Sequence, residues 1–420
     1  MARRLTHLVF LTVIIHFAHA QSMTYDEVLD LELSENRKNS EWGMQQDYVI
    51  MISIDGFRHD YARKFNAENI LRLANQGAQV ERLIASFPTK TFPNHYTLVT
   101  GLLPGNHGIV SNEFYSRGKD YWYKIRDKKA VTDPSWYGGK PLWVLAEEQG
   151  MLSANFFWVG SEAPIGGLIS NYSYAYNARI PNECRIRRIL DWLTLPEVER
   201  PHLMLGYISL VDDAGHRYGP DHENTRSAVL EVDALIGDLM DGVEHLNLPV
   251  NIVLVSDHGM SEINQGIVLP EVVDLQDAKV SYSFPPMIYQ PDDAKKKKLY
   301  EELLKVNDLE VYTHETIPGY LRFQNKDRIG DLMILTDAPT IILAEPGSVT
   351  GGTHGFNPYT HEEMGAIFYT YGPSIKPGVT LPPTENIHVY PFIASLLNLN
   401  VDVPIDGNNA ALEPMRADFK

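Results

Sequence analysis

The sequence predicts an α/β protein with a largely parallel central sheet flanked by helices and a smaller inserted subdomain. Its 420 residues are 44% hydrophobic, which supplies a large core and excludes a disordered chain. Three nearly continuous apolar runs, at 48–54, 203–211 and 251–256, each lead into an aspartate. Such runs are typical of strands that are buried on both faces, as in a parallel sheet.

A helix is expected between the second and third strands. From Thr225 to Leu246 the apolar residues recur at helical spacing, and the order strand, helix, strand is that of a βαβ unit. Ligands of open α/β sheets bind beyond the carboxyl ends of the strands. We therefore expect Asp55, Asp212 and Asp257, which follow the three runs, to face one crevice.

The N-terminus has the three regions of a secretory signal peptide, which we assign to residues 1–20. Two arginines precede an apolar run at 8–17, and Ala18-His19-Ala20 provides a cleavage site. The alternative is a membrane anchor, but the run falls short of the roughly 20 residues needed to cross a bilayer. The mature protein is thus expected to be secreted, with no transmembrane anchor. In that setting Asn171, in an Asn-Tyr-Ser sequon, is a glycosylation site if it lies in a surface loop.

The rest of the chain divides by composition. Residues 21–46 are polar and acidic, and we interpret them as an extended or partly helical lead-in. The main domain is expected over 47–400, with 268–342 as an insertion packed on the main sheet because its apolar pattern is looser. Residues 401–420 remain as a C-terminal tail.

Charge and cysteine content exclude several classes of protein. Lys and Arg number 36 against 54 Asp and Glu, a net charge of −18, so a nucleic-acid scaffold is not expected as a partner. Cys184 is the single cysteine of the sequence. A disulfide framework within the chain and a cysteine-type zinc site are thereby excluded.

Metal-ligand side chains follow the predicted strands. Asp212 and His216 are four residues apart, Asp257 precedes His258, and His354 lies between glycine-rich segments. Carboxylate and imidazole together favour zinc, with manganese or cobalt as substitutes. Any one of the 15 histidines could be a structural residue, but this grouping at strand ends predicts a metal site.

A second chemical element is the segment 87–97. Pro93 fits the first turn of a helix, which leaves Thr91 just before the helix, where amide donors and the helix dipole favour an anion. Metal coordination can activate a threonine hydroxyl as a nucleophile. The alternative is a plain capping threonine, and this segment alone does not decide between the two.

Taken together, these motifs resemble the ectonucleotide pyrophosphatase/phosphodiesterase family of the alkaline phosphatase superfamily. The resemblance spans roughly residues 47–400 and rests on four ordered segments: Lys90–Tyr96 with Thr100–Leu102, Asp55–Arg58, Asp212–His216 with Tyr218–Pro220, and Ser256–Met260.

The resemblance implies an alkaline-phosphatase-like fold and two zinc ions. One ion would be held by Asp212, His216 and His354, and the other by Asp55, Thr91, Asp257 and His258. Thr91 would be the nucleophile and form a phosphothreonine intermediate. Asn112 and the amide of Phe92 would contact a phosphate oxygen.

The resemblance also indicates the substrate. Phe92 and Tyr176 match aromatic residues that sandwich a nucleobase, and Trp158 matches a neighbouring pocket residue, which favours small nucleotide phosphodiesters or pyrophosphates and release of nucleoside 5′-monophosphates. Val131 stands where several nucleotide-specific members have a lysine. Two alternatives stay open: a choline-type or lysophospholipid phosphodiesterase, and a catalytically inactive extracellular binding relative.

Overall fold

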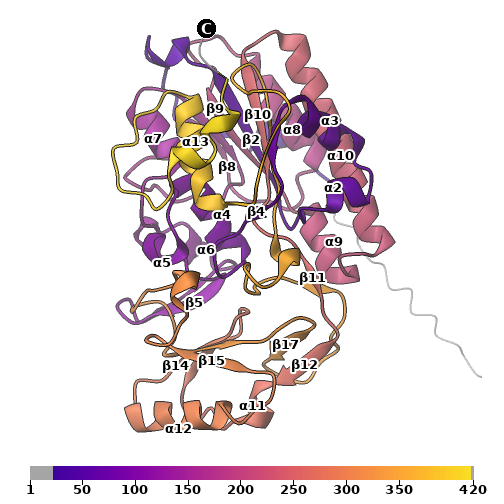
Figure 1. The fold of residues 1–420 in the computed structure, drawn as a ribbon. Coiled ribbons are helices and arrows are strands. Elements are labelled where there is room, and N and C mark those ends of the chain that lie inside the picture. Colours follow the sequence, from indigo (N-terminus) through magenta and orange to yellow (C-terminus); the bar gives the residue numbers. More distant parts are fainter. Residues whose placement is uncertain (1–21, 418–420) are drawn as a thin grey trace, which may run out of the picture.

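The computed structural model describes residues 22–417 and is built around a nine-stranded sheet (Figure 1). In spatial order its strands are β1 (Leu33–Ser34), β8 (Tyr172–Tyr174), β7 (Ser153–Phe156), β9 (Leu203–Ile208), β2 (Tyr48–Ile54), β10 (Val250–Val255), β19 (Phe368–Tyr371), β3 (Ala78–Val80) and β20 (Val379–Leu381).

The centre of this sheet is parallel, which confirms the predicted fold class. Strands β8, β7, β9, β2 and β10 run in one direction. Strand β19 runs antiparallel to both of its neighbours, β10 and β3, and β1 is antiparallel to β8. The three predicted strands are adjacent, so the residues that follow them lie at one edge of the sheet.

Alternate side chains of β2 enter two different cores. Val49 and Met51 pack in one core, and Ile50 and Ile52 pack in the other. This is the two-sided burial that the continuous apolar run predicts, because successive side chains of a strand point to opposite faces.

Helices cover both faces of the sheet (Figure 1). One face carries α3 (Glu68–Gln76), α8 (Asn182–Leu193) and α10 (Glu223–Leu246). The other carries α4 (Thr91–Thr100), α7 (Leu142–Glu148) and α13 (Val389–Leu396). The helix expected from the apolar spacing at 225–246 is α10.

A second, four-stranded sheet lies at one end of the molecule (Figure 1). It comprises β13 (Lys279–Ser281), β14 (Met287–Tyr289), β16 (Leu332–Leu335) and β15 (Glu310–Thr313), with α11 (Leu269–Val272) and α12 (Asp293–Leu303) beside it. It contacts the hairpin of β5 (Glu113–Ser116) and β6 (Tyr121–Lys124). Tyr289 packs edge-on against Tyr115 and Trp122 of that hairpin. Through Met287, Tyr289 and Met333 the insertion also joins the core that covers one face of the main sheet.

The two terminal segments are integrated into the fold. The lead-in contains α1 (Tyr25–Leu29) and β1. At the other end, Leu412 and Met415 are buried in the first core. The predicted signal peptide, residues 1–20, lies outside the described residues. Between residues 22 and 417, no helix combines the length and the apolar character that a membrane crossing requires.

One predicted boundary is wrong. The apolar run at 203–211 suggested a strand up to Asp212, but β9 ends at Ile208 and α9 (Leu210–Tyr218) begins two residues later. Val211 is buried, so the first apolar residues of the helix extend the strand's hydrophobic pattern. Asp212 therefore lies in the first turn of a helix.

Candidate active site

Two aspartates meet because their strands are neighbours. Asp55 follows β2 and Asp257 follows β10, and these strands are parallel and in register. Both side chains are buried, and the Gly56 N–H donates to Asp257 Oδ1 at 3.2 Å. Gly56 has φ +67°, and a Cβ there would lie 3.0 Å from Asp212. A glycine at this turn thus allows α9 to approach the end of the sheet.

Helix α9 brings the third carboxylate. Asp212 and His216 are four residues apart and lie on the same face, with 3.5 Å between Asp212 Oδ1 and His216 Nε2. His354 follows β18 (Gly352–Thr353), which pairs with β11 (Ser261–Glu262). Its Nε2 lies 3.9 Å from the same Asp212 oxygen. Two segments that are distant in the sequence thus converge on Asp212.

Each of three histidines is oriented by a backbone carbonyl. The Nδ1 atoms of His216, His258 and His354 lie 2.9, 2.9 and 2.7 Å from the carbonyl oxygens of Gly352, Gly259 and Thr89. A carbonyl can only accept, so each Nδ1 carries the proton and each Nε2 is left as a lone-pair donor. Metal-binding histidines are commonly held in this way.

Asp257 and His258 are consecutive, yet both face the cluster. His258 Nε2 lies 2.8 Å from Asp257 Oδ2 and 3.5 Å from Asp55 Oδ1. This is feasible because β10 has ended at Val255, so the strict alternation of a strand no longer applies.

Thr91 lies at the edge of the same cluster. Its Oγ1 is 3.4 Å from His258 Nε2. Thr91 is the first residue of α4, with Lys90 as the N-cap and Pro93 two residues further on. The helix therefore begins slightly earlier than the position of Pro93 predicted. The Phe92 N–H donates to Asn112 Oδ1 at 2.9 Å, which brings Asn112 to the N-terminus of the helix.

The three carboxylates of the cluster are buried close together, so their negative charges repel one another. Asp55 Oδ1, Asp212 Oδ1 and Asp257 Oδ2 are buried oxygens without a hydrogen-bond partner among the described residues. Burial, followed by the charge of Asp257, raises the pKa of Asp55 and of Asp212 well above their usual range. Burial opposes ionisation of Asp257 as well, but His258 and His95 outweigh it and lower its pKa. Such a cluster is incomplete without cations.

The donor set fits divalent metal ions. Two groups have their ligand atoms within 4.8 Å of one another: Asp55, Asp257 and His258, and Asp212, His258 and His354. The first group lies within one of the expected ligand sets. The second group differs from the other expected set in one residue, because it contains His258 where His216 was expected. His216 Nε2 lies 3.5 Å from Asp212 Oδ1. Oxygen and imidazole ligands of this kind suit zinc.

A cavity of about 450 Å³ opens onto the cluster. The predicted substrate residues Phe92, Asn112, Trp158 and Tyr176 all line it, as does Val131. Tyr176 is 53% exposed, whereas its neighbours Tyr172 and Tyr174 are buried. The cavity therefore combines aromatic faces with the carboxylate and histidine cluster at its base.

Comparison with known proteins places this arrangement in a family. The sequence model described as "Type I phosphodiesterase / nucleotide pyrophosphatase" matches residues 49–357. The chain belongs to this family. The match spans most of the chain and includes all of the cluster residues.

Individual relatives agree with this assignment. Human ectonucleotide pyrophosphatase/phosphodiesterase family member 1 is 34% identical over 390 residues, 88% of this chain but 42% of the relative. The chain thus spans less than half the length of that relative. An uncharacterized pyrophosphatase/phosphodiesterase of Schizosaccharomyces pombe is 34% identical, over 88% of this chain and 79% of the relative. The structure of murine family member 5 is 28% identical, with a TM-score of 0.83 over 88% of this chain and 100% of that chain.

Three residues that contact the cluster or line its cavity were not predicted from the sequence. Tyr207 donates its hydroxyl to Asp55 Oδ2 at 2.6 Å, and His95 Nδ1 lies 3.3 Å from Asp257 Oδ2. Lys90 lines the cavity, and burial lowers its pKa to about 8. His95 is four residues after Thr91, so helical spacing could have indicated it. Tyr207 lies within an apolar strand and gave no signal.

The glycosylation expectation at Asn171 is wrong for the folded chain. The Asn171 side chain is fully buried, and its Oδ1 accepts the Arg37 N–H at 2.8 Å. A glycan on its Nδ2 would need space that the packed lead-in occupies. The sequon is therefore not in the surface loop that glycosylation requires.

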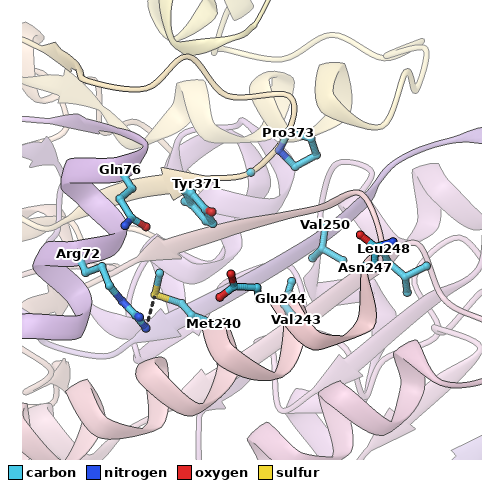
Figure 2. Close-up of a pocket in the computed structure, with 11 residues that line it drawn as sticks. Arg72, Gln76, Met240, Val243, Glu244, Asn247, Leu248, Val250, Tyr371 and Pro373 are labelled. Atoms are coloured by element: carbon cyan, nitrogen blue, oxygen red, sulfur yellow. Dashed lines mark hydrogen bonds between the residues drawn. The ribbon is translucent and has the colours of Figure 1, made fainter.

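A different cavity, of about 810 Å³, lies at the opposite end of β10 (Figure 2). Arg72 of α3 points towards Met240 of α10 there and also pairs with Asp241 at 3.0 Å. Val250, the first residue of β10, lines it, whereas Asp257 follows the other end of that strand. None of the predicted site residues lines this cavity.

Proposed function

We propose that the chain is a secreted two-zinc phosphodiesterase that hydrolyses nucleotide phosphodiester or pyrophosphate bonds and releases nucleoside 5′-monophosphates. We assign the catalytic domain to residues 47–400. Secretion is supported by the signal-peptide pattern and by relatives named venom phosphodiesterases, one of which, from Macrovipera lebetinus, is 32% identical over 88% of this chain.

The observation that carries the proposal is the position of Thr91. Its hydroxyl lies at the N-terminus of α4 and 3.4 Å from His258, beside three carboxylates with unpartnered oxygens. A helix N-terminus favours a phosphate anion, and an adjacent cation site can activate the hydroxyl. A threonine that only capped a helix would not need three buried carboxylates and a histidine beside its hydroxyl.

The residues that would hold the two ions are those of the cluster. We assign Asp212, His216 and His354 to one, and Asp55, Thr91, Asp257 and His258 to the other. When bound, such ions lower the pKa of a coordinated hydroxyl and stabilise charge on a phosphoryl group. Three carboxylates and one alkoxide would balance the charge of two Zn²⁺ ions, so an anionic substrate need not enter a negative site.

Thr91 is proposed to act as the nucleophile. It loses its hydroxyl proton, its oxygen forms a bond to phosphorus, and the bond from phosphorus to the leaving-group oxygen breaks with its electron pair. The resulting phosphothreonine is then attacked by water, whose oxygen bonds to phosphorus. The bond from phosphorus to Thr91 Oγ1 breaks, its electron pair stays on Oγ1, and Oγ1 takes up the proton that the attacking water loses. The Phe92 N–H, which donates to Asn112 Oδ1 in the structure, and the Asn112 side-chain amide are proposed to turn to a phosphoryl oxygen when substrate binds.

The aromatic lining favours a nucleotide. Phe92 and the exposed ring of Tyr176 both line the cavity, and Trp158 adds an apolar wall. Such faces stack bases of any identity. A threonine-to-alanine variant of murine family member 5, described as inactive, has been solved in complex with AMP, at a TM-score of 0.84 and 28% identity. Choline-type phosphodiesters are the second candidate, because aromatic rings also bind quaternary ammonium groups.

The test is zinc-dependent hydrolysis of the p-nitrophenyl ester of thymidine 5′-monophosphate, beside p-nitrophenyl phosphate and p-nitrophenylphosphorylcholine. We expect selective turnover of the thymidine diester and its loss in Thr91→Ala. Turnover of only the choline ester would replace the nucleotide by the second candidate. If zinc-loaded protein cleaved none of the three, the chain would be an inactive relative.

A further inference from the structure

A second cavity, of about 500 Å³, adjoins the one that opens onto the cluster. The two cavities share Asn112, Ile125 and Arg126 in their linings. Beyond these three residues, the second is lined by Glu113, Lys124, Tyr282 and Ser283. Asn112, the residue proposed above to hold a phosphoryl oxygen, therefore lies between the two cavities.

Arg126 is the available cation at this junction. It is exposed in the turn between β6 and α6 (Lys128–Val131), and it has no ion pair or hydrogen bond among the described residues. Neighbouring Asp127 forms no ion pair with it, and the Asp127 oxygens instead accept the Lys129 N–H and the Tyr121 hydroxyl, each at 3.0 Å. Lys124, by contrast, pairs with Glu113 at 3.0 Å.

The position of the turn is tied to the catalytic residues. The Ile125 N–H donates to the Asn112 carbonyl at 3.2 Å. Arg126 is the next residue, so its backbone lies at a fixed place relative to Asn112. The long Arg126 side chain can therefore reach a leaving group that is attached to a phosphorus atom held at Asn112.

The insertion builds the opposite wall. Ser111 Oγ donates to Ser283 Oγ at 2.8 Å, which joins the loop after β13 to the segment of Asn112. Phe284 packs against Phe356, two residues after His354, with 4.8 Å between the ring centres. Tyr282 is half-buried, and its hydroxyl has no partner among the described residues.

The first cavity is less suited to a second phosphate than its neighbour. Glu162 and Asp213 both line it, and their carboxylates would repel an additional anion there. The second cavity has one carboxylate, Glu113, and that group is paired with Lys124. The second cavity offers the unpaired guanidinium of Arg126 and the hydroxyl groups of Tyr282 and Ser283. Guanidinium and hydroxyl groups are typical donors to phosphate.

We propose that the second cavity is the leaving-group subsite, and that Arg126 determines specificity for leaving groups that carry a further phosphate. The inference rests on the proposed function. The nucleoside occupies the aromatic cavity, and the rest of the substrate passes Asn112 towards Tyr282. When the phosphorus–oxygen bond breaks, the electron pair leaves with the departing phosphate. Arg126 then stabilises a product that is one unit more negative.

The experiment compares two leaving groups on a nucleotidyl substrate. In zinc-loaded protein, kcat/KM is measured for ATP, which loses pyrophosphate, and for the p-nitrophenyl ester of thymidine 5′-monophosphate, which loses a phenolate. We expect Arg126→Gln to lower the ratio of the ATP value to the ester value by about tenfold, the size of one lost charge-assisted contact. Arg126→Lys should restore part of this ratio.

The matched control is Lys297→Gln, which removes the same charge from a site 77% exposed on α12. Its ratio should equal that of the wild type. Pyrophosphate should also inhibit the wild type more strongly than Arg126→Gln. An unchanged ratio in Arg126→Gln, or one that falls equally in Lys297→Gln, would overturn the subsite while leaving the proposed function standing. Wild-type protein that cleaves neither substrate would overturn both.

Discussion

The Tyr207 hydroxyl donates to Asp55 Oδ2 at 2.6 Å across the adjacent strands β9 and β2. This bond satisfies one oxygen of a buried carboxylate and leaves Oδ1 facing Asp257 and His258. Tyr207 therefore orients a proposed zinc ligand without needing to contact the substrate. Replacing a residue of this kind typically costs about 10- to 100-fold in metal affinity or activity.

Tyr207→Phe should weaken zinc binding by about 10- to 100-fold, because Asp55 then loses its positioning hydrogen bond. Zinc titration of the metal-free protein, followed by calorimetry, would measure this change. Activity should recover at high zinc concentration. Tyr61→Phe is the matched control, since the Tyr61 hydroxyl is buried without a partner, and equal zinc affinity for the two variants would contradict the role of Tyr207.

Removal of metal should destabilise the fold. Without cations, Asp55, Asp212 and Asp257 share one site, where burial first and the charge of Asp257 second raise the pKa of Asp55 and of Asp212. An ion present at a thousandfold its dissociation constant stabilises the folded state by about 4 kcal/mol. EDTA should therefore lower the melting temperature by several degrees, and an unchanged melting curve would count against a structural role for metal.

The repulsion among the three carboxylates also predicts that Asp212→Asn stabilises the metal-free protein, whereas metal removal destabilises the wild type. The substitution removes one negative charge from the cluster, so the metal-free variant should be more stable than the metal-free wild type. Its response to EDTA should be smaller, because one ligand is missing. Thermal unfolding with and without EDTA measures both effects, and a variant less stable than wild type in EDTA would contradict the argument.

The central strands and their aspartates were predictable because they are encoded locally. The apolar runs of β2 and β10 end at polar residues, and parallel strands bring these ends to one edge. The same reasoning misplaced the end of β9, since the buried Val211 of α9 continues its apolar pattern. A run of apolar residues shows burial but does not separate a strand from the helix that follows it.

Other parts of the site depend on contacts between distant segments. His354 was named from the sequence as a metal-ligand type, but its place beside Asp212 results from the pairing of β18 with β11. Arg126 is an ordinary exposed arginine in the sequence, and only the turn that Asn112 holds brings it between the cavities. The contact of Tyr289 in the insertion with Tyr115 and Trp122 likewise joins distant segments, and composition does not encode it.

The aromatic wall yields a prediction about substrate choice. Tyr176→Ala removes a 53% exposed ring that packs 5.2 Å from Phe157 at the cavity. Base stacking contributes about 1 to 3 kcal/mol, so KM for the thymidine ester should rise by about five- to tenfold or more while kcat changes less. Val272→Ala, at a 40% exposed position on α11 away from the cavity, is the control. A KM unchanged by Tyr176→Ala would remove this ring from the nucleotide-binding site.

His107 gives the stability a pH dependence that is independent of the metal cluster. It is fully buried between Thr97 and Ile109, and burial lowers its pKa to about 3. Its Nδ1 accepts the Ile109 N–H, so Nε2 carries the proton and donates to Thr97 Oγ1 at 3.0 Å. The folded state therefore holds neutral His107, whereas the unfolded state takes up a proton below its ordinary pKa of about 6.5.

Because the folded-state pKa is depressed, the contribution of His107 is present above pH 6.5 and is lost as the pH falls towards 3. Between pH 7 and pH 5, this one group should lower the free energy of unfolding by about 2 kcal/mol. His107→Gln can keep an acceptor and a donor but does not titrate, so its stability should fall less over the same interval. Urea unfolding of both proteins at pH 7, 6 and 5 measures the difference, in which the shared titration of the carboxylate cluster cancels. Parallel curves would show that His107 stays neutral in both states or is charged in the fold.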